Sequence, residues 1–526
     1  MDDAPALDRP WRRPGAAAYA WSRVRGILRP PVTVTEVPDG LLVTDHDVPV
    51  TTRDGTVLRV NVHRPPGGEP RPVVLCAHPY GKDRLPERGL PRPYRMLRQP
   101  VPVAFSRLTG WEAPDPVWCA QQGWVTVNAD LRGSGTSDGR GALLSDQEGE
   151  DVADLVEWAA QQPWSNGRVA MMGVSYLAIS QWKSAALRPR GLRAIVVWEG
   201  FTDAYRDLLK PGGVRENGFV RFWAAGLRGN RLAYDLPEEI RRHPEHDGFW
   251  QALVPAVERI EVPALVCGSF SDNNLHSRGS LRGFLALGSA EKHLWTHRGG
   301  KWATFYGAAA RRDQRAFLAR HLDDEDAPPL PRVRLEVHET REASTVRSED
   351  AWPPPAARTR TLHLSAAGLG PAPDAAGSIG FRTRSRGVRF GWTVPEDLEV
   401  VGAPTLRLHV EAGAELTLVA GLEKWVDGRY VPFEGSYGFG RDRVTTGWHA
   451  VPAGAHQVEV EMGPTATRFR RGDQLRLVVA GRWLWPRNPL TGQFPGWYPP
   501  GPRTSCTLRW GPGLRAGLDL PVVAAD

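Results

Sequence analysis

The chain has 526 residues, of which 41% are hydrophobic and 24% are charged. These values are ordinary for a globular protein and exclude disordered, collagen-like and coiled-coil chains. No apolar run is long enough to span a membrane, so no membrane partner is expected. The net charge of +7 comes from basic residues scattered among acidic ones without a Lys/Arg-rich run, which argues against nucleic acid as a partner.

Four cysteines are spread widely along the sequence, with no Cys-x-x-Cys pair and no spacing typical of a metal site. Two of them, Cys76 and Cys267, lie in apolar strand-like runs, where a buried free thiol is expected. The first residues contain no apolar core of the kind that a secretory signal needs. We therefore expect a cytoplasmic location and neither a metal nor an organic cofactor.

Strand-like and helix-like segments alternate after a Pro- and Arg-rich N-terminal arm over residues 1–40. Strands are predicted over 57–63, 73–77 and 124–130, because these runs are apolar and rich in β-branched residues. Residues 147–162 place apolar side chains at helical spacing behind an acidic first turn. Strand, helix and strand patterns follow up to residue 200, which predicts a layered α/β sheet.

Residues 201–258 interrupt this alternation, because they are helix-like and rich in Arg and aromatic residues, with no strand pattern. The α/β pattern resumes over 259–325, so residues 41–200 and 259–325 are predicted to form one domain around a helical insertion. From 326 to 526 helical signals nearly vanish, and short alternating runs are separated by Gly/Pro-rich turns. This pattern is typical of an all-β sandwich.

The segment Gly173-Val-Ser175-Tyr-Leu-Ala178 follows a predicted strand and opens a predicted helix. In that context the pattern G-x-S-x-G is a nucleophile elbow, whose tight turn exposes the serine hydroxyl. The helix dipole and the following N–H can then stabilise an oxyanion. Ala178 replaces the last glycine of the pattern, but it is still small. A serine that only caps the helix is the competing interpretation.

A nucleophilic serine needs a base, and the base needs an orienting acid, in the chain order Ser, acid, His for this kind of sheet. Asp272 and His297 each follow a strand-like run, at positions where the active sites of α/β sheets gather. We predict Asp272 as the orienting acid and His297 as the base. His293 and His276 are rival bases, ranked lower because His293 precedes its strand and His276 is expected within the helix after Asp272.

Donors for the oxyanion are expected from two tyrosines. The strand-like run VVLCA ends in His78-Pro-Tyr80-Gly-Lys82, and the Tyr80 hydroxyl on this loop can pair with the backbone N–H of Tyr176 across the oxyanion. A packing role for Tyr80 before a glycine turn is the alternative.

Two other segments resemble ligand motifs without meeting their requirements. Residues 133–139 are glycine-rich after a strand, but the third glycine is misplaced for a dinucleotide fingerprint and no helix begins there. Residues 243–247, His-Pro-Glu-His-Asp, contain metal-binding residue types, but Pro244 disfavours a helical pair of ligands. We expect a solvated loop there.

Several long segments closely resemble the cocaine-esterase-like (CocE/NonD) serine hydrolases, which are related to α-amino acid ester hydrolases and X-prolyl dipeptidyl peptidases. They are HPYGK (78–82), DLRGSGTSDG (130–139), EGEDVADLVEWAAQQPWSNGRVAMMGVSYLAISQW (148–182), the SFSDNN segment around Asp272, and WLWPRNPLTG (483–492). The resemblance extends over nearly all of 41–526.

The resemblance implies an α/β-hydrolase domain over 41–200 and 259–325, a helical cap over 201–258 and a C-terminal jelly-roll β-sandwich over 326–526. It assigns Ser175 as nucleophile, Asp272 as orienter and His297 as general base, with Tyr80 and Tyr176 as oxyanion donors. Asn273 follows Asp272 where the family usually has glycine, and His297 lacks the usual Gly-Pro-Trp-Ser-His context.

We therefore predict a serine hydrolase that cleaves a small-molecule ester, or an amide, through an acyl-enzyme. An X-Pro peptidase is the alternative, and it would need Glu199, Asp203 or Asp207 to bind a substrate ammonium. A non-catalytic carbohydrate-binding protein is a further alternative, in which four aromatic residues of the β region form a stacking platform: Trp483, Trp485, Trp497 and Tyr498. The oligomeric state is left open, with a homodimer as one option.

Overall fold

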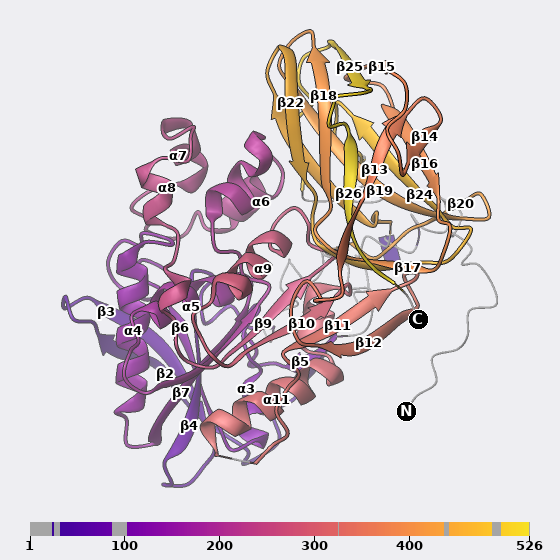
Figure 1. Ribbon diagram of the computed structural model, residues 1–526. Helices are drawn as coiled ribbons and strands as arrows, with labels where there is room; N and C mark the ends of the chain where they lie inside the picture. Colours follow the sequence, from indigo (N-terminus) through magenta and orange to yellow (C-terminus); the bar gives the residue numbers. More distant parts are fainter. Residues whose placement is uncertain are drawn as a thin grey trace.

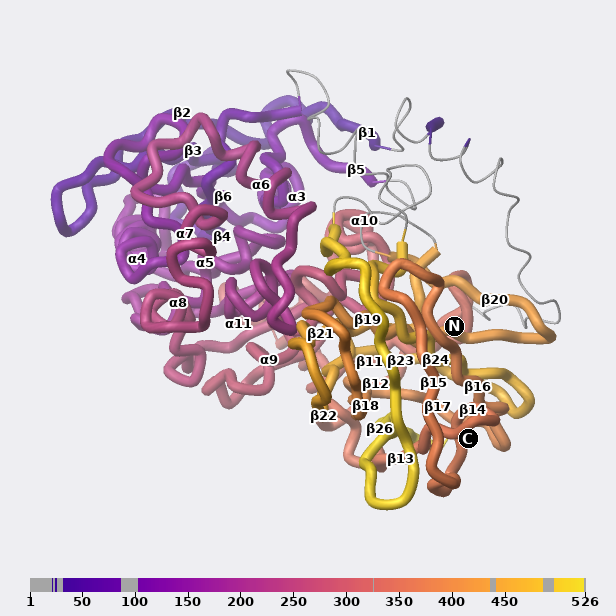
Figure 2. The backbone as a smooth tube through the Cα atoms, turned by 90° about the horizontal axis from the view of Figure 1, so that it is seen from above, coloured from indigo at the N-terminus to yellow at the C-terminus, as the bar shows by residue number. Residues whose placement is uncertain are grey.

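The computed structural model describes residues 21, 24–25, 32–86, 103–324, 326–435, 441–485 and 496–524. An α/β part, with short helices at one end, lies beside an all-β part (Figure 1). The view from above shows the same two parts next to each other, joined along one side (Figure 2). No helix in the described part of the chain is long and apolar enough to cross a membrane.

The α/β part is built on one sheet, with the spatial order β2-β3-β6-β4-β7-β8-β9-β10-β11-β12. Neighbours from β6 to β11 are parallel, whereas the strands at the two ends pair antiparallel. The carboxyl ends of the parallel strands therefore meet at one edge, where ligand sites of such sheets form. The strands are β2 (Val43–Thr51), β3 (Val57–Arg64), β4 (Arg71–His78), β6 (Val125–Asp130), β7 (Ser165–Val174), β8 (Leu192–Trp198), β9 (Ala264–Ser269), β10 (Lys292–His297), β11 (Val333–His338) and β12 (Ser344–Glu349).

Helices cover both faces of this sheet, because its central strands are buried on both sides. The residues of β4 alternate between the two cores: Val73 and Leu75 face one, and Val74 faces the other. The first core is covered by α4 (Asp146–Ala160), α5 (Tyr176–Ala186) and α9 (Ser277–Ala286), and the second by α3 (Pro116–Gln121) and α11 (Ala308–Leu322). The small pair β1 (Val32–Thr35) and β5 (Val103–Ser106) and the short helix α10 (Lys301–Phe305) also lie on the second side.

The segment between β8 and β9 consists of short helices, as the sequence predicts. They gather at one end of the α/β part (Figure 1). They are the π-helix η2 (Tyr205–Leu209), the 3-10 helices η3 (Pro211–Gly213) and η4 (Val257–Arg259), and the α-helices α6 (Phe219–Gly226), α7 (Leu236–Arg242) and α8 (Gly248–Ala252). We call residues 201–258 the cap.

The C-terminal part has two facing groups of strands with an apolar core between them. In the first group β26 pairs with β13, β17 and β18, and β18 also pairs with β22 and β25. In the second group the order is β16-β24-β19, with β20 and β21 beside β19. The strands are β13 (Arg358–Ser365), β14 (Gly368–Gly370), β15 (Gly377–Arg382), β16 (Val388–Thr393), β17 (Leu398–Gly402), β18 (Thr405–Ala412), β19 (Leu416–Val426), β20 (Arg429–Val431), β21 (Thr445–Val451), β22 (Gly454–Glu461), β23 (Thr465–Phe469), β24 (Gln474–Ala480), β25 (Ser505–Trp510) and β26 (Gly517–Ala524).

The predicted succession of an α/β part and an all-β part is confirmed. One detail differs, since β11 and β12 lie beyond residue 326 and yet extend the α/β sheet through the pairing of β10 with β11. Their alternating pattern is the same as that of sandwich strands, so the sequence alone does not separate them. The domain limits and the jelly-roll topology stay predictions. Most of the arm over 1–40 and residues 486–492 of the family-like WLWPRNPLTG segment lie outside the described residues.

Two arginines, one of them fully buried, join the two parts. Arg298, directly after β10, is fully buried and donates from Nη1 to the carbonyl oxygen of Val444 at 3.0 Å, while its guanidinium lies 4.5 Å from the centre of the Phe433 ring. From α9, Arg278 donates to the carbonyl oxygen of Thr446 at 3.0 Å and stacks over another ring of the β part. These contacts attach the loops after β9 and β10 to the C-terminal strands.

Replacing Arg298 should therefore weaken the whole protein. In Arg298→Met the buried carbonyl oxygen of Val444 loses its donor, and we expect the free energy of unfolding to fall by about 2 kcal/mol or more. Urea unfolding followed by tryptophan fluorescence measures this change. Arg389→Met, at an exposed position of β16, is the matched control and should unfold like the wild type. Equal stability of the two variants would show that the junction does not depend on Arg298.

Candidate active site

Ser175 lies in the sharp turn between β7 and α5, with φ 59° and ψ −118°. A residue other than glycine adopts such a backbone conformation only when its surroundings hold it there. Gly173 allows the turn, because a Cβ atom at this position would lie 2.3 Å from the Cβ of Leu177. Ala178, in place of the last glycine of the motif, fits because Gly200 opposite has no side chain; a Cβ there would lie 2.9 Å from that of Ala178.

His276 is the histidine that contacts the serine. Its Nε2 lies 3.0 Å from the Oγ of Ser175, and both side chains are buried. The residue is the N-cap of α9, so its ring points from the start of the helix and stacks on Phe201 at 5.6 Å between centres. Burial, and then the positive charge of Lys301, hold the pKa of His276 well below its ordinary value of 6.5. The imidazole is therefore neutral at neutral pH and able to accept a proton.

His297, the predicted base, contacts Glu199 and not Ser175. It is the last residue of β10, and its Nε2 is 3.0 Å from Oε1 of Glu199, while its Nδ1 is 3.3 Å from the hydroxyl of Thr304. The structure thus places His276, and not His297, against Ser175. The sequence favours His297 because His276 is expected inside a helix. In the structure α9 begins at Ser277, so His276 precedes the helix as its N-cap.

Asp272 lies in the loop that carries His276. Its carboxylate forms a buried ion pair with Lys301, with Nζ 2.9 Å from Oδ2. Its backbone carbonyl accepts N–H groups from Leu275, His276 and Ser277, each at 3.2 Å. Asp272 therefore fixes the turn that leads into α9. The Nδ1 of His276 has no hydrogen-bond partner within the described part of the chain.

Tyr80 approaches the serine from the loop after β4. Its hydroxyl accepts a hydrogen bond from Nε1 of Trp223, a residue of the cap helix α6, at 3.2 Å. Burial raises the pKa of Tyr80 far above its ordinary value of 10, against smaller opposing effects of hydrogen bonds with Trp223 and Ser175. The hydroxyl therefore keeps its proton at neutral pH, and its role as an oxyanion donor stays a prediction.

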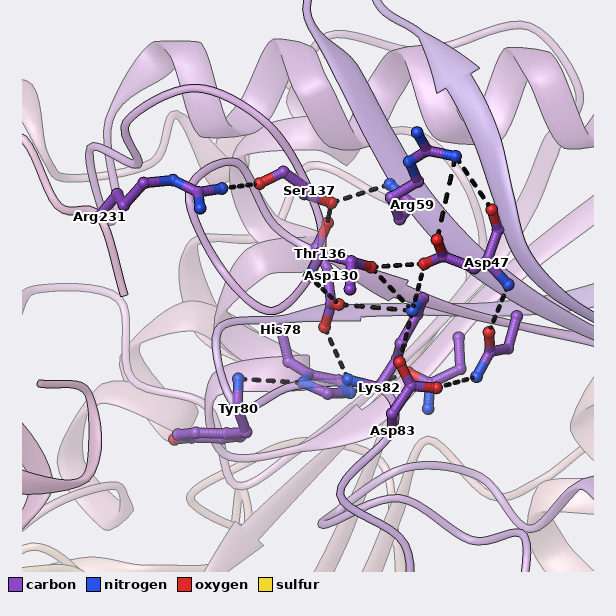
Figure 3. A network of polar contacts seen from close by, with 12 residues as sticks. Asp47, Arg59, His78, Tyr80, Lys82, Asp83, Asp130, Thr136, Ser137 and Arg231 are labelled. Carbon is purple, nitrogen blue, oxygen red and sulfur yellow. Dashed lines mark hydrogen bonds and ion pairs between the residues drawn. The ribbon is translucent and has the colours of Figure 1, made fainter. Parts of the chain in front are cut away.

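A polar network behind Tyr80 holds this loop in place (Figure 3). The ammonium of Lys82 is fully buried and binds Asp47 at 2.8 Å, Asp83 at 2.7 Å and Thr136 at 3.0 Å. The backbone N–H of Lys82 donates to Asp130 at 2.6 Å. These contacts fix the main chain two residues after Tyr80.

The glycine-rich segment 133–139 belongs to the same network rather than to a nucleotide site. Asp130 accepts the N–H of Thr136 at 3.1 Å, and Gly135, with φ +49°, leaves room for its carboxylate. A Cβ at Gly135 would lie 1.9 Å from Oδ2 of Asp130. The segment also contacts the cap, because Arg231 donates to the carbonyl oxygen of Ser137.

Tyr176, the second predicted donor, is the first residue of α5, where the backbone N–H is not used by helical hydrogen bonds. Its ring is fixed on two sides: the hydroxyl donates to Glu148 at 2.7 Å, and the ring stacks on Trp223 at 6.1 Å between centres. The ring of Tyr80 meets it edge-on at 6.3 Å. The aromatic residues Tyr80, Tyr176 and Trp223 thus form one group beside Ser175.

The three acids considered for binding an ammonium already have partners. Glu199 binds His297, Asp203 binds His246 at 3.0 Å, and Asp207 binds Arg282. They do not form a free acidic pocket. In the described part of the chain, no group of three or more His, Cys, Asp or Glu residues has the geometry of a metal site.

The aromatic residues proposed as a carbohydrate platform are packed instead. Trp483 and Tyr498 are buried, and their rings lie 4.7 Å apart. Trp448 meets Tyr498 at 4.5 Å, and Val214 of the cap belongs to the same cluster. This cluster fills the junction between the cap and the β part.

Sequence reasoning missed two buried residues behind Ser175. Lys301 pairs with Asp272, and Glu112, with φ 61°, accepts Nε1 of Trp302 at 3.0 Å. Burial raises the pKa of Glu112 to about 8, so this carboxyl is largely protonated at neutral pH. Neither residue stands in a motif, and no signal in the sequence separates them from surface charges.

Comparison with known proteins identifies the family and the fold. Residues 54–234 match the X-Pro dipeptidyl-peptidase (S15) family, and residues 326–484 match the non-catalytic C-terminal domain of X-Pro dipeptidyl-peptidases. A CocE/NonD family hydrolase from Staphylococcus aureus has a TM-score of 0.85 and 30% identity, covering 92% of this chain and 94% of that one. An α-amino acid ester hydrolase has a TM-score of 0.72 at 17% identity, covering 93% and 98%, which shows the shared α/β-hydrolase fold.

The curated relatives are matched over part of their length. Cocaine esterase from a Rhodococcus strain is 26% identical over 405 residues, 65% of this chain and 66% of the esterase. A serine esterase of Mycobacterium bovis is 30% identical over 210 residues, 39% of this chain and 31% of that protein. The chain thus spans about two thirds of the first of these relatives and less than a third of the second.

Labelling with a fluorophosphonate tests which histidine activates the serine. We expect Ser175 to be labelled, and His276→Asn to slow the labelling about 100-fold or more, because a general base contributes that much. His297→Asn should be labelled at nearly the wild-type rate, and its melting temperature controls for misfolding. Fast labelling of His276→Asn together with slow labelling of His297→Asn would instead support His297 as the base.

Proposed function

The chain belongs to the CocE/NonD family of hydrolases, and on that premise we propose that it cleaves carboxylic esters through an acyl-enzyme formed on Ser175. The observation that carries this proposal is the hydrogen bond of 3.0 Å between Ser175 Oγ and the neutral His276, at a strained turn on the carboxyl edge of the sheet. The substrate is a small-molecule ester. A cytoplasmic location remains a prediction of the sequence, and the sequence leaves the oligomeric state open.

In the first step Ser175 Oγ attacks the carbonyl carbon of the ester, and Nε2 of His276 takes the hydroxyl proton. The low pKa of His276 ensures that Nε2 is free to accept this proton at neutral pH. The same lowered pKa means that the imidazolium, once formed, gives up its proton more readily than an ordinary imidazolium. It readily gives its proton to the leaving alcohol when the tetrahedral intermediate collapses.

Negative charge on the carbonyl oxygen is stabilised by the Tyr80 hydroxyl and the Tyr176 N–H. Both are fixed before the substrate arrives, Tyr80 by Trp223 and by the Lys82 network, and Tyr176 by its place at the start of α5. Donors held in this way need no reorganisation during the reaction, and each contributes about 3 kcal/mol to the stability of the transition state.

The second half of the reaction repeats the first with water. His276 removes a proton from a water molecule, which attacks the acyl carbonyl, and the intermediate releases the acid and restores Ser175. Asp272 is a positioning residue here, because it holds the turn before α9 through its carbonyl and its ion pair with Lys301. His297 contacts Glu199 and takes no part in these steps.

An X-Pro peptidase is the second candidate, since the matching family model carries that description. Such an enzyme would need an unoccupied carboxylate for the ammonium of its substrate. Glu199, Asp203 and Asp207 are all bound to basic side chains of the protein, which favours the ester over the peptide.

Turnover of 4-nitrophenyl butyrate tests the proposed function. Ser175→Ala should lower kcat at least about a thousandfold, because the nucleophile is lost. Tyr80→Phe should lower kcat about 100-fold with little change in KM, because the donor acts on the transition state. Alanyl-prolyl-4-nitroanilide should be a far poorer substrate than the ester. Full activity of Ser175→Ala, or a preference for the anilide, would contradict the proposal.

A further inference from the structure

The cap contains a cavity of about 800 Å³ between α6 and α7. Its volume lies within the range of pockets that enclose small molecules. Apolar surface comes from Leu143, Val220 and Tyr234, and several arginines line the remainder. The helices that enclose it lie together at the cap end of the molecule (Figure 1).

Three of the four acids in the lining already have partners within the protein, two in ion pairs and one in hydrogen bonds. Arg241 pairs with Glu238, and Arg242 pairs with Glu239 at 2.9 Å. The carboxylate of Glu216 accepts four backbone N–H groups, three at the start of α6 and one from residue 497 at 2.8 Å. Asp235 is the remaining acid of the lining.

Three arginines of the lining have no carboxylate bound to them in the described part of the chain. Within the described part of the chain, Arg215, Arg221 and Arg228 take part in no ion pair. Arg215 is partly buried and donates only to the carbonyl oxygen of Pro237, at 3.2 Å. Burial, and then the charges of Arg241 and Arg221, lower the pKa of Arg215. The guanidinium groups of these three residues are therefore close enough to repel one another. An anion in the cavity would relieve this repulsion.

The cavity adjoins the active site through Trp223. This residue lines the cavity, donates to the Tyr80 hydroxyl at 3.2 Å and stacks on Tyr176. It therefore lies on the oxyanion side of Ser175. The leaving group must lie near His276, which gives it a proton, and His276 packs instead on Phe201. The end of the substrate that points toward the cavity is thus the acyl end.

We propose that the cap cavity binds an anionic group, a carboxylate in the first place, at the far end of the acyl chain of the substrate. The inference rests on the proposed ester hydrolysis and names its substrate class: half-esters of dicarboxylic acids and similar anionic acyl esters. Arg215 and Arg221 hold the anion, because a guanidinium matches the geometry of a carboxylate with two parallel N–H donors. The apolar surface of Leu143 and Val220 accommodates the intervening methylene chain.

Two esters with acyl chains of equal carbon number test this inference. They are 4-nitrophenyl hexanoate, which is neutral, and the mono-4-nitrophenyl ester of adipic acid, which ends in a carboxylate. We expect the wild type to favour the adipate in kcat/KM about tenfold or more, the effect of a charge-assisted contact. Added KCl should reduce kcat/KM for the adipate and leave that for the hexanoate nearly unchanged, because salt screens the arginines.

Variants assign the preference to the cavity. Arg215→Met should lower kcat/KM for the adipate about tenfold and change that for the hexanoate little. Arg221→Met, at an exposed position, should act in the same direction and guards against misfolding of the Arg215 variant. Arg389→Met in β16 carries the same charge change outside the cavity and should behave like the wild type.

The outcomes separate this inference from the proposed function. A wild type that hydrolyses neither ester contradicts the proposed function itself. Hydrolysis of hexanoate without a preference for adipate overturns only the inference that the cavity binds an anionic acyl group. A preference for adipate that survives both Arg215→Met and Arg221→Met overturns the same inference. A preference that is lost in these two variants and kept in Arg389→Met supports the assignment.

Discussion

The strained turn at Ser175 is the constraint on which the site depends. A backbone conformation of this kind costs about 1–3 kcal/mol and persists only when the packing around it permits no other. Here that packing consists of close approaches, of Gly173 to Leu177 and of Gly200 to Ala178, which press α5 against β7 and β8. The result is a hydroxyl that stands clear of the sheet edge and a helix N-terminus directed at the reacting carbonyl.

Each of the other groups at the site is fixed by a contact with a different part of the chain. The Lys82 network holds the loop of Tyr80, and the cap contributes Trp223 to the hydroxyl of that residue. Arg278 of α9 connects the loop of His276 to the β part, because it donates to the carbonyl oxygens of Asn273 in the loop and Thr446 in the β part. The C-terminal strands therefore take part in building the site without lending it a reacting group.

Much of this arrangement follows from the sequence. The alternation of strands and helices and the segment around Ser175 indicate the fold, because periodicity and turn glycines are local signals. No local sequence signal separates His276 from His297 as the base, since both histidines lie near the carboxyl edge of the same sheet. It depends on where α9 begins and which way the ring at its N-cap points. Lys301 and Glu112 have no local signal either, and only the folded chain shows that they are buried behind the serine.

The aromatic residues of the β part show that composition alone can also suggest a site that the fold does not form. Trp483 and Tyr498 have the composition of a carbohydrate platform, yet they pack against Trp448 and Val214 at the junction with the cap. Exposure decides between these roles, and composition does not reveal exposure.

The assignment of His276 as the base is central to the proposed mechanism, and chemical rescue tests it directly. Removing the ring in His276→Gly leaves a space beside Ser175 that free imidazole can enter. We predict that imidazole restores ester hydrolysis to His276→Gly in a saturable manner and has no such effect on His297→Gly. Rescue of His297→Gly, with His276→Gly retaining wild-type activity in the absence of imidazole, would contradict the assignment of His276 as the base.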